Sequence, residues 1–331
     1  MKKLSILGLA IATLIAGCTT TNSPISTTTS TKIVNPNAVY TQYATVPTQY
    51  ITAENGVRYA YRRMGKPQAV PIIYFNHLAA NMDNCDPRIM DAMAQTHEII
   101  CFDYKGVGET SGEDAKSIQE MAQDSLAFIN ALGYQKVDIM AFSMGGFISQ
   151  EIMALKPDLI RKIILAGTGG RGGQGINHVT KITYKDIVKG QLKGVDPKYF
   201  LFFNSSESGK IAATDFLNRL QERQENRDTP AKIKNLRAQL KAIKAWSKES
   251  PADLSSFTMP VLVINGDHDR MVPTINSYDL AKRFPNAQLH IYENSGHGAI
   301  FQYHEDFVQR AKAFFADNAT PNSQTFKQSN H

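Results

Sequence analysis

The chain has 331 residues, of which 42% are hydrophobic and 20% are charged, and its formal net charge is +6. This length and apolar content exclude a largely disordered chain, and they allow one large α/β domain with an insertion or two small domains. No nucleic-acid-binding motif accompanies the positive charge, so we expect no nucleic-acid partner.

The first 18 residues have the features of a secretory signal. Two lysines are followed by an apolar run over residues 4–15, which is short for a membrane span, and then by the sequence IAGC, which ends at Cys18. This segment resembles the lipobox of bacterial lipoproteins, and the resemblance implies cleavage before Cys18 and attachment of lipid to its thiol. We expect a lipid-anchored protein of the cell envelope, and because Thr19 rather than aspartate follows, we expect it at the outer membrane of a cell that has two membranes.

Both ends of the chain lack the apolar spacing of a folded domain. Residues 19–46 are rich in Thr, Ser, Asn and Pro, which predicts a disordered tether. Residues 318–331 are predicted to form a flexible tail. The folded domain is therefore expected over residues 47–317.

Cysteine usage leaves one pairing open. If Cys18 is acylated, Cys85 and Cys101 remain, and an oxidising compartment permits a disulfide between them. It does not require one, because Cys101 lies in an apolar strand, where a buried free thiol is common. No Cys or His cluster has the spacing of metal ligands, so we expect no metal.

Apolar runs predict an eight-stranded sheet. A hairpin is expected first, because Asn55-Gly56 separates two strand-like runs. Continuous apolar runs then alternate with amphipathic helices, a pattern typical of a mostly parallel sheet with helices on both faces. The predicted strands cover residues 49–53, 57–63, 70–75, 98–103, 137–140, 160–166, 260–265 and 288–292, and the main helices cover 118–132, 145–155, 274–284 and 305–315.

Residues 169–256 break this alternation and are predicted to form an inserted helical cap. The segment begins GGRGGQG, which is typical of a hinge, and continues as helical patterns without strands. Ile233, Leu236, Leu240 and Ile243 recur along one predicted helix. This spacing favours packing against neighbouring helices over contact with a substrate.

The cap has a surplus of positive charge. Residues 171–249 contain 16 Lys and Arg against 8 Asp and Glu. Such a surplus is compatible with contact to anionic lipid head groups or with attraction of acidic substrates. The charges recur at helical intervals without aromatic residues between them, which favours a simply solvated set of helices.

The segment KVDIMAFSMGGF places Ser143 between a buried strand and the start of a helix. A turn this sharp holds the serine in a strained backbone conformation, so the residues two before and two after it need to be small. Ala141 and Gly145 meet this need. The same turn directs the N–H of Met144 toward an oxyanion beside the hydroxyl. The pattern favours a nucleophile, although small-residue serine loops also occur as plain turns.

Two further loops supply residues that can activate a serine. One apolar strand ends at a loop with Asp267, His268 and Asp269, and the last strand is followed by ENSGHG, which contains His297. The chain order is serine, acid, histidine, each beyond the carboxyl end of a strand. Because those ends lie along one edge of a parallel sheet, we expect Ser143, an aspartate and His297 to meet there.

Four segments together resemble the α/β-hydrolase fold family over residues 47–317. They are AFSMGG, INGDHDRMVP, ENSGHG and DYKGVGETSG, the last with Lys105 where the family has arginine. The loop FNHLAANMDN is similar to that of enol-lactonases, simple esterases and cofactor-free haloperoxidases or perhydrolases. The resemblance implies an α/β fold with a mostly parallel eight-stranded sheet, and hydrolysis without a metal or organic cofactor.

The resemblance also implies a role for each residue that activates the serine. Ser143 attacks a carbonyl carbon, and His297 takes its proton, because a free hydroxyl is almost never ionised at neutral pH. Asp269 orients His297 and stabilises the imidazolium. Asp267 is the alternative, and the family pattern favours Asp269.

The loop after the strand at residues 70–75 is expected to complete the site. The oxyanion would accept hydrogen bonds from the backbone N–H groups of Leu78 and Met144, with Ala79 as the alternative if the loop is shifted by one residue. His77 is expected to shape this loop rather than to transfer protons.

These features predict a serine hydrolase that cleaves a small-molecule ester or lactone through an acyl-enzyme. A carboxylate would be needed in place of Ser143 for an epoxide hydrolase or a haloalkane dehalogenase. Carbon–carbon bond hydrolysis and perhydrolysis use the same three residues and remain alternatives. A non-catalytic surface lipoprotein is the alternative of a different class, and the filled positions at all three residues argue against it. The sequence leaves the natural substrate, its acyl chain length and the oligomeric state open.

Overall fold

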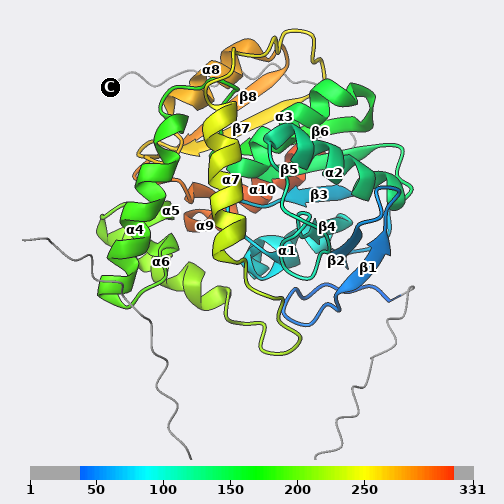
Figure 1. Ribbon diagram of the computed structural model, residues 1–331, viewed down its shortest axis with the longest axis horizontal. Coiled ribbons are helices and arrows are strands. Elements are labelled where there is room, and N and C mark those ends of the chain that lie inside the picture. The colour runs from blue at the N-terminus through cyan, green and yellow to red at the C-terminus, as the bar shows by residue number, and fades with distance from the viewer. Residues whose placement is uncertain (1–37, 317–331) are drawn as a thin grey trace, which may run out of the picture. The chain divides into compact units, whose positions relative to one another are not determined.

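An eight-stranded sheet forms the centre of the computed structural model, which describes residues 38–316 (Figure 1). The strands lie in the order β1-β2-β4-β3-β5-β6-β7-β8. The second strand pairs antiparallel with both of its neighbours, and all other pairs are parallel, so the predicted sheet is confirmed. The strands are β1 (Gln49–Thr52), β2 (Arg58–Met64), β3 (Ile72–Phe75), β4 (Ile99–Phe102), β5 (Val137–Phe142), β6 (Ile160–Ala166), β7 (Val261–Gly266) and β8 (Ala287–Tyr292).

Helices connect the strands and cover the sheet. The predicted hairpin joins β1 to β2 through Gly56, whose φ of 75° is a conformation that glycine adopts without strain. The α-helices are α1 (Pro87–Ala94), α2 (Ile118–Ala131), α3 (Met144–Leu155), α4 (Val179–Lys193), α5 (Lys198–Phe202), α6 (Glu207–Arg219), α7 (Ile233–Trp246), α8 (Ile275–Arg283), α9 (Ala299–Gln302) and α10 (His304–Phe315). Short 3-10 turns are η1 (Met82–Asn84), η2 (Pro157–Leu159) and η3 (Ile176–His178).

Alternate residues of the parallel strands face two hydrophobic layers. Ile73 and Phe75 of β3 pack with residues of α2, α3 and α7, whereas Ile72 and Tyr74 pack with residues of α1 and α10. Side chains on a strand point to opposite faces in turn, so a continuous apolar run buries both faces. This explains why the strands lack polar alternation.

The segment between β6 and β7 contains η3 and α4 to α7, and no strand (Figure 1). These helices lie within the predicted cap, and α7 packs beside α4 and α2. Leu236, Leu240 and Ile243 of α7 are buried as predicted. The prediction is wrong for Ile233, which begins the helix and is 56% exposed.

The folded part of the chain begins earlier than residue 47. Tyr43 and Val46, which the sequence assigned to the tether, are buried. The backbone oxygens of both residues accept hydrogen bonds from Arg223 Nη1, at 3.0 and 2.8 Å. The end of the predicted tether is therefore wrong, because a cap residue far away in the sequence binds it.

Several sequence predictions concern residues outside the described range. The lipobox at Cys18, the tether over residues 19–37 and the tail over 318–331 all lie there. Among residues 38–316, none of the helices combines the length and the apolar content that a bilayer crossing requires. The open question of Cys85 and Cys101 is answered by a disulfide between them.

Two buried carboxyl groups connect the cap to the loop after β4. Asp103 follows β4, and Asp228 lies between α6 and α7. Met82 N–H donates to Asp103 Oδ1 at 2.8 Å and to Asp228 Oδ2 at 3.3 Å, so the two carboxyl groups lie close together. Burial and the neighbouring Asp228 raise the pKa of Asp103 well above its ordinary value of 3.8. Two buried carboxylates this close repel each other, so we expect Asp103 to hold its proton to a higher pH than an exposed aspartate does.

Asp103→Asn is expected to raise the free energy of unfolding relative to wild type, by an amount that grows with pH. The unfolded carboxyl ionises near its ordinary pKa of 3.8 while the buried one stays protonated. As the pH rises above the pKa of the unfolded carboxyl, the free energy of unfolding of the wild type falls by about 1.4 kcal/mol per pH unit. The fall ends at the pKa of Asp103 in the folded protein. Urea unfolding at pH 5 and pH 7 measures the difference. An equal effect of the substitution at both pH values contradicts a raised pKa of Asp103.

Candidate active site

Ser143 lies on a strained turn between β5 and α3. Its φ of 56° and ψ of −118° are rare for a residue with a side chain. The turn is held because Ser143 N–H donates to Ala166 O, and Thr168 Oγ1 donates to Ser143 O, both at 2.9 Å. A Cβ at Gly145 would lie 2.3 Å from Phe75 O, so only glycine fits there. The surrounding backbone fixes the hydroxyl at the start of the helix.

The structure brings Ser143, His297 and Asp269 into one hydrogen-bonded chain. His297 Nε2 lies 2.9 Å from Ser143 Oγ, and His297 Nδ1 lies 2.7 Å from Asp269 Oδ2. The three side chains come from the loops after β5, β8 and β7. A carboxylate only accepts, so Nδ1 holds the proton and leaves Nε2 free to accept from the serine hydroxyl.

Backbone N–H groups decide which aspartate faces the histidine. Asp269 Oδ1 accepts from Met271 N at 2.8 Å and from Val272 N at 3.0 Å, which turns the other oxygen toward His297. Asp267 instead lies 2.6 Å from His268 Nδ1 and accepts the N–H groups of residues 294 and 295. The structure thus places Asp269, and not Asp267, at His297.

The loop after β3 contains two of the backbone N–H groups that the sequence analysis considered for the oxyanion, those of Leu78 and Ala79. Within residues 38–316, the N–H groups of Leu78 and Met144 have no protein acceptor. The Ala79 N–H is occupied, because it donates to Gln239 Oε1 at 2.7 Å. The N–H groups of Leu78 and Met144 are therefore unoccupied, whereas that of Ala79 is not.

Gln239 is a site residue that the sequence did not reveal. It lies on the buried side of α7 and holds Ala79, whose φ of 55° is unusual for a residue with a side chain. The one available signal was a polar residue next to Leu240 on the helix face that also carries Leu236 and Ile243. A buried amide needs a partner, but its position in the sequence does not say which one.

His77 is uncharged at neutral pH. Burial, with the nearby Lys198, lowers its pKa to about 3. Its Nδ1 lies 2.8 Å from Leu78 O, so a neutral ring donates to the loop that presents the Leu78 N–H. This contact fits the expectation that His77 shapes the loop.

Aromatic side chains enclose the histidine. The rings of Phe142 and Phe202 lie 4.9 and 5.7 Å from the His297 ring, centre to centre. Phe202 belongs to α5, and its carbonyl accepts the Gly298 N–H at 2.7 Å. Ser143 is only 8% exposed, so the cap covers the site and lowers the local dielectric constant.

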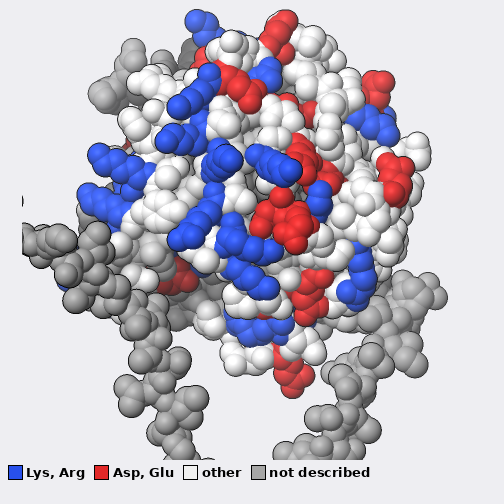
Figure 2. Space-filling view, viewed as in Figure 1, with Lys and Arg blue, Asp and Glu red and all other residues white. Residues whose placement is uncertain are grey.

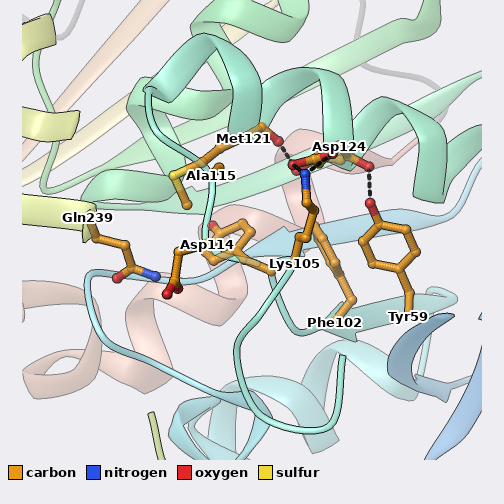
Figure 3. A pocket seen from close by; sticks show the side chains of 10 residues that line it. Tyr59, Phe102, Lys105, Asp114, Ala115, Met121, Asp124 and Gln239 are labelled. Carbon is orange, nitrogen blue, oxygen red and sulfur yellow. Dashed lines mark hydrogen bonds and ion pairs between the residues drawn. The ribbon is translucent and has the colours of Figure 1, made fainter. Parts of the chain in front are cut away.

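Lys105 holds the loop after β4 against α2, where the family pattern has arginine. Its Nζ lies 3.1 Å from Asp124, as Figure 3 shows, and 3.4 Å from Glu120. Figure 3 shows Lys105 and Gln239 on the wall of a small hollow. The hollow is lined by Tyr59, Phe102, Tyr104, Lys105, Asp114, Ala115, Met121, Asp124, Ser125 and Gln239.

Comparison with known proteins identifies the family of the chain. A family model described as the alpha/beta hydrolase fold matches residues 70–302. The chain belongs to the α/β-hydrolase family. Within residues 38–316, no group of three or more His, Cys, Asp or Glu side chains could hold a metal ion.

Individual members of the family match most of this α/β hydrolase. A solved α/β-hydrolase fold protein from Chitinophaga pinensis is 38% identical with a TM-score of 0.79, covering 83% of this chain and 99% of its own. The poly(3-hydroxyalkanoate) depolymerase of Ectopseudomonas oleovorans is 29% identical, over 71% of this chain and 80% of its own. The 2-hydroxy-6-oxo-6-(2'-aminophenyl)hexa-2,4-dienoic acid hydrolase of Metapseudomonas resinovorans is 24% identical, over 80% and 89%.

Proposed function

We propose that this α/β hydrolase cleaves a carboxylic ester or a lactone through an acyl-enzyme on Ser143. The observation that supports it most is the hydrogen-bonded chain from Ser143 Oγ through His297 to Asp269, at 2.9 and 2.7 Å. A serine hydroxyl needs such a base to attack a carbonyl carbon at neutral pH.

In the proposed mechanism, His297 Nε2 takes the hydroxyl proton as Ser143 Oγ bonds to the carbonyl carbon. The oxyanion accepts hydrogen bonds from Leu78 and Met144 N–H, and the loss of one such donor typically costs about 3 kcal/mol. The carbon–oxygen bond to the alcohol then breaks, and the imidazolium returns the proton to that alcohol. Water repeats the sequence on the acyl-enzyme and releases the carboxylic acid.

The similarity to a depolymerase of poly(3-hydroxyalkanoate), which is a polyester, supports ester cleavage. Carbon–carbon bond hydrolysis is the second candidate, because the Metapseudomonas resinovorans relative is named for a substrate without an ester bond. Both reactions would use Ser143, His297 and Asp269. The choice between them depends on the substrate.

Turnover of p-nitrophenyl esters of increasing acyl length, and of simple lactones, tests the proposal. We expect a burst of p-nitrophenol equal to the amount of enzyme, followed by slower hydrolysis, because p-nitrophenol is a good leaving group and the acyl-enzyme then reacts with water more slowly than it formed. A vinylogous 1,5-diketone acid serves as the comparison substrate, because its cleavage breaks a carbon–carbon bond and no ester bond. Cleavage of the diketone acid without turnover of any ester or lactone would favour the second candidate.

Gln239→Ala is expected to lower kcat/KM about tenfold to a hundredfold, mainly through kcat. The substitution leaves the Ala79 N–H unpaired and frees the loop that presents Leu78 N–H, and a misplaced donor loses transition-state stabilisation. Gln239→Glu keeps an acceptor and should restore much of the activity. Ester kinetics of the two variants measure this, and equal losses in both would contradict a positioning role for Gln239.

We also propose that Cys18 carries the lipid that holds the protein at the outer membrane. The lipobox-like sequence before Cys18 supports this proposal. Labelled fatty acid fed to cells should attach to the wild-type chain and not to Cys18→Ser. Equal labelling of both chains would contradict the anchor.

A further inference from the structure

The outer side of the cap gathers positive charge on two neighbouring helices. The helices α4 and α7 pack against each other, and Figure 2 shows basic side chains spread over both. We call this surface the basic face. Its exposed cations, on the two helices and the residues that flank α7, are Lys181, Lys185, Lys189, Lys193, Lys232, Lys234, Arg237, Lys241, Lys244 and Lys248.

Neither helix carries an exposed acidic residue, and the acidic side chains that Figure 2 shows nearby lie beside the basic face rather than on it. The helix α7 contains no Asp or Glu, and the single acidic residue of α4, Asp186, is buried and paired with Arg270. Of the cations on the basic face, only Lys234 forms an ion pair with a described residue, at 3.5 Å from Glu113 and 4.0 Å from Asp114. The rest of the charge is available to an anionic partner.

Apolar side chains are exposed among the lysines. Tyr184, Val188 and Leu192 follow each other at four-residue steps, which places them along one stripe of α4. Val188 is 54% and Leu192 is 82% exposed, and Ile233 of α7 is also exposed. Single exposed apolar residues are ordinary on a protein surface, but an apolar stripe bordered by lysines is typical of helices that lie in a membrane interface.

We propose that the basic face docks on the surface of an anionic phospholipid bilayer. The lysines would lie at the head-group phosphates, and Tyr184, Val188 and Leu192 would enter the boundary with the acyl chains. A second copy of the chain is a poor occupant, because a symmetric contact would set these cations against each other. Attraction of an acidic substrate would need the charge but not the exposed apolar stripe.

Membrane docking by the basic face would be independent of ester hydrolysis, and it differs from the simply solvated set of helices that the sequence pattern favoured. The sequence pattern showed charges at helical intervals but not that α4 and α7 lie side by side. It also assigned Ile233 to the packed side of α7, whereas the structure exposes it. The juxtaposition of the two helices makes one continuous surface.

Vesicle flotation of the full chain with Cys18→Ser tests the docking. Binding is compared between vesicles of phosphatidylcholine alone and vesicles with one third phosphatidylglycerol. The ratio of the two binding constants removes any contribution of the N-terminal segment that does not depend on lipid charge. We expect strong preference for the anionic vesicles, reduced by added salt. Replacing Lys185, Lys241 and Lys244 with Gln should lower that binding about a hundredfold, since each cation near an anionic surface contributes about fivefold.

Two further variants make the test specific. Lys66, Lys136 and Lys156 are exposed at the opposite edge of the sheet, so their replacement with Gln removes the same charge and should change binding little. Val188→Ser with Leu192→Ser keeps the charge and should weaken binding about tenfold.

Any of three results would overturn the proposal: no preference for anionic vesicles, unchanged binding of the Lys185, Lys241 and Lys244 variant, or an equal loss in the control. If that variant binds vesicles normally but shows a raised KM for acidic esters, the basic face instead attracts substrates. Thermal unfolding of every variant checks that these exposed substitutions leave the fold intact.

Discussion

Ser143→Ala is expected to lower kcat for ester hydrolysis about 10⁶-fold while the protein stays folded. Without the hydroxyl no acyl-enzyme forms, and the remaining groups cannot act separately, because the serine, histidine and aspartate work as a unit. Steady-state turnover of a p-nitrophenyl ester measures the loss. The burst of p-nitrophenol should disappear together with the turnover.

Ser125 provides a matched control for this variant. It is also buried, and its hydroxyl donates only to the backbone oxygen of Met121 in α2. Ser125→Ala removes the same atom and should leave kcat within a few-fold of wild type. Substantial activity in Ser143→Ala, or an equal loss of kcat in Ser125→Ala, would contradict the assignment of Ser143 as the nucleophile.

Asp269→Asn is expected to lower kcat about 10⁴-fold with little change in KM. An asparagine amide can donate to His297 Nδ1, which moves the ring proton to Nε2 and leaves no acceptor for the Ser143 hydroxyl. The loss arises from the wrong tautomer rather than from a displaced ring. Ester kinetics together with unchanged thermal unfolding would separate this effect from misfolding.

Asp267→Asn is the comparison that distinguishes the two aspartates. Asp267 contacts His268 and the backbone of the loop before His297, so its replacement should affect stability more than kcat. A larger loss of kcat in Asp267→Asn than in Asp269→Asn would mean that the observed hydrogen bond is not the functional one.

Local patterns were sufficient to predict the sheet, the serine turn and the position of His297. Continuous apolar runs bury both faces of parallel strands, and the strand ends bring distant loops to one edge. The spacing around Asp267 and Asp269 was less informative, since both lie on the same loop. Their separation depends on the N–H groups of Met271 and Val272, whose directions follow from the folded turn.

The contacts that the cap makes with the rest of the fold could not be predicted from the sequence. Gln239 binds Ala79 across 160 positions, and Arg223 binds Tyr43 across 180. Neither pair has a local signature, because each depends on how the helices of the cap pack against the strands. The structure was therefore needed to show that the folded region begins before residue 47 and that Gln239 supports the loop after β3.

Reaction with a fluorophosphonate ester, followed by mass spectrometry of the peptides, tests the central claim most directly. Such esters bond to a serine only when a neighbouring base activates it. We predict one adduct per chain, located on Ser143, and none in His297→Ala. Ester hydrolysis by a protein that forms no adduct, or an adduct on a different residue, would contradict the account.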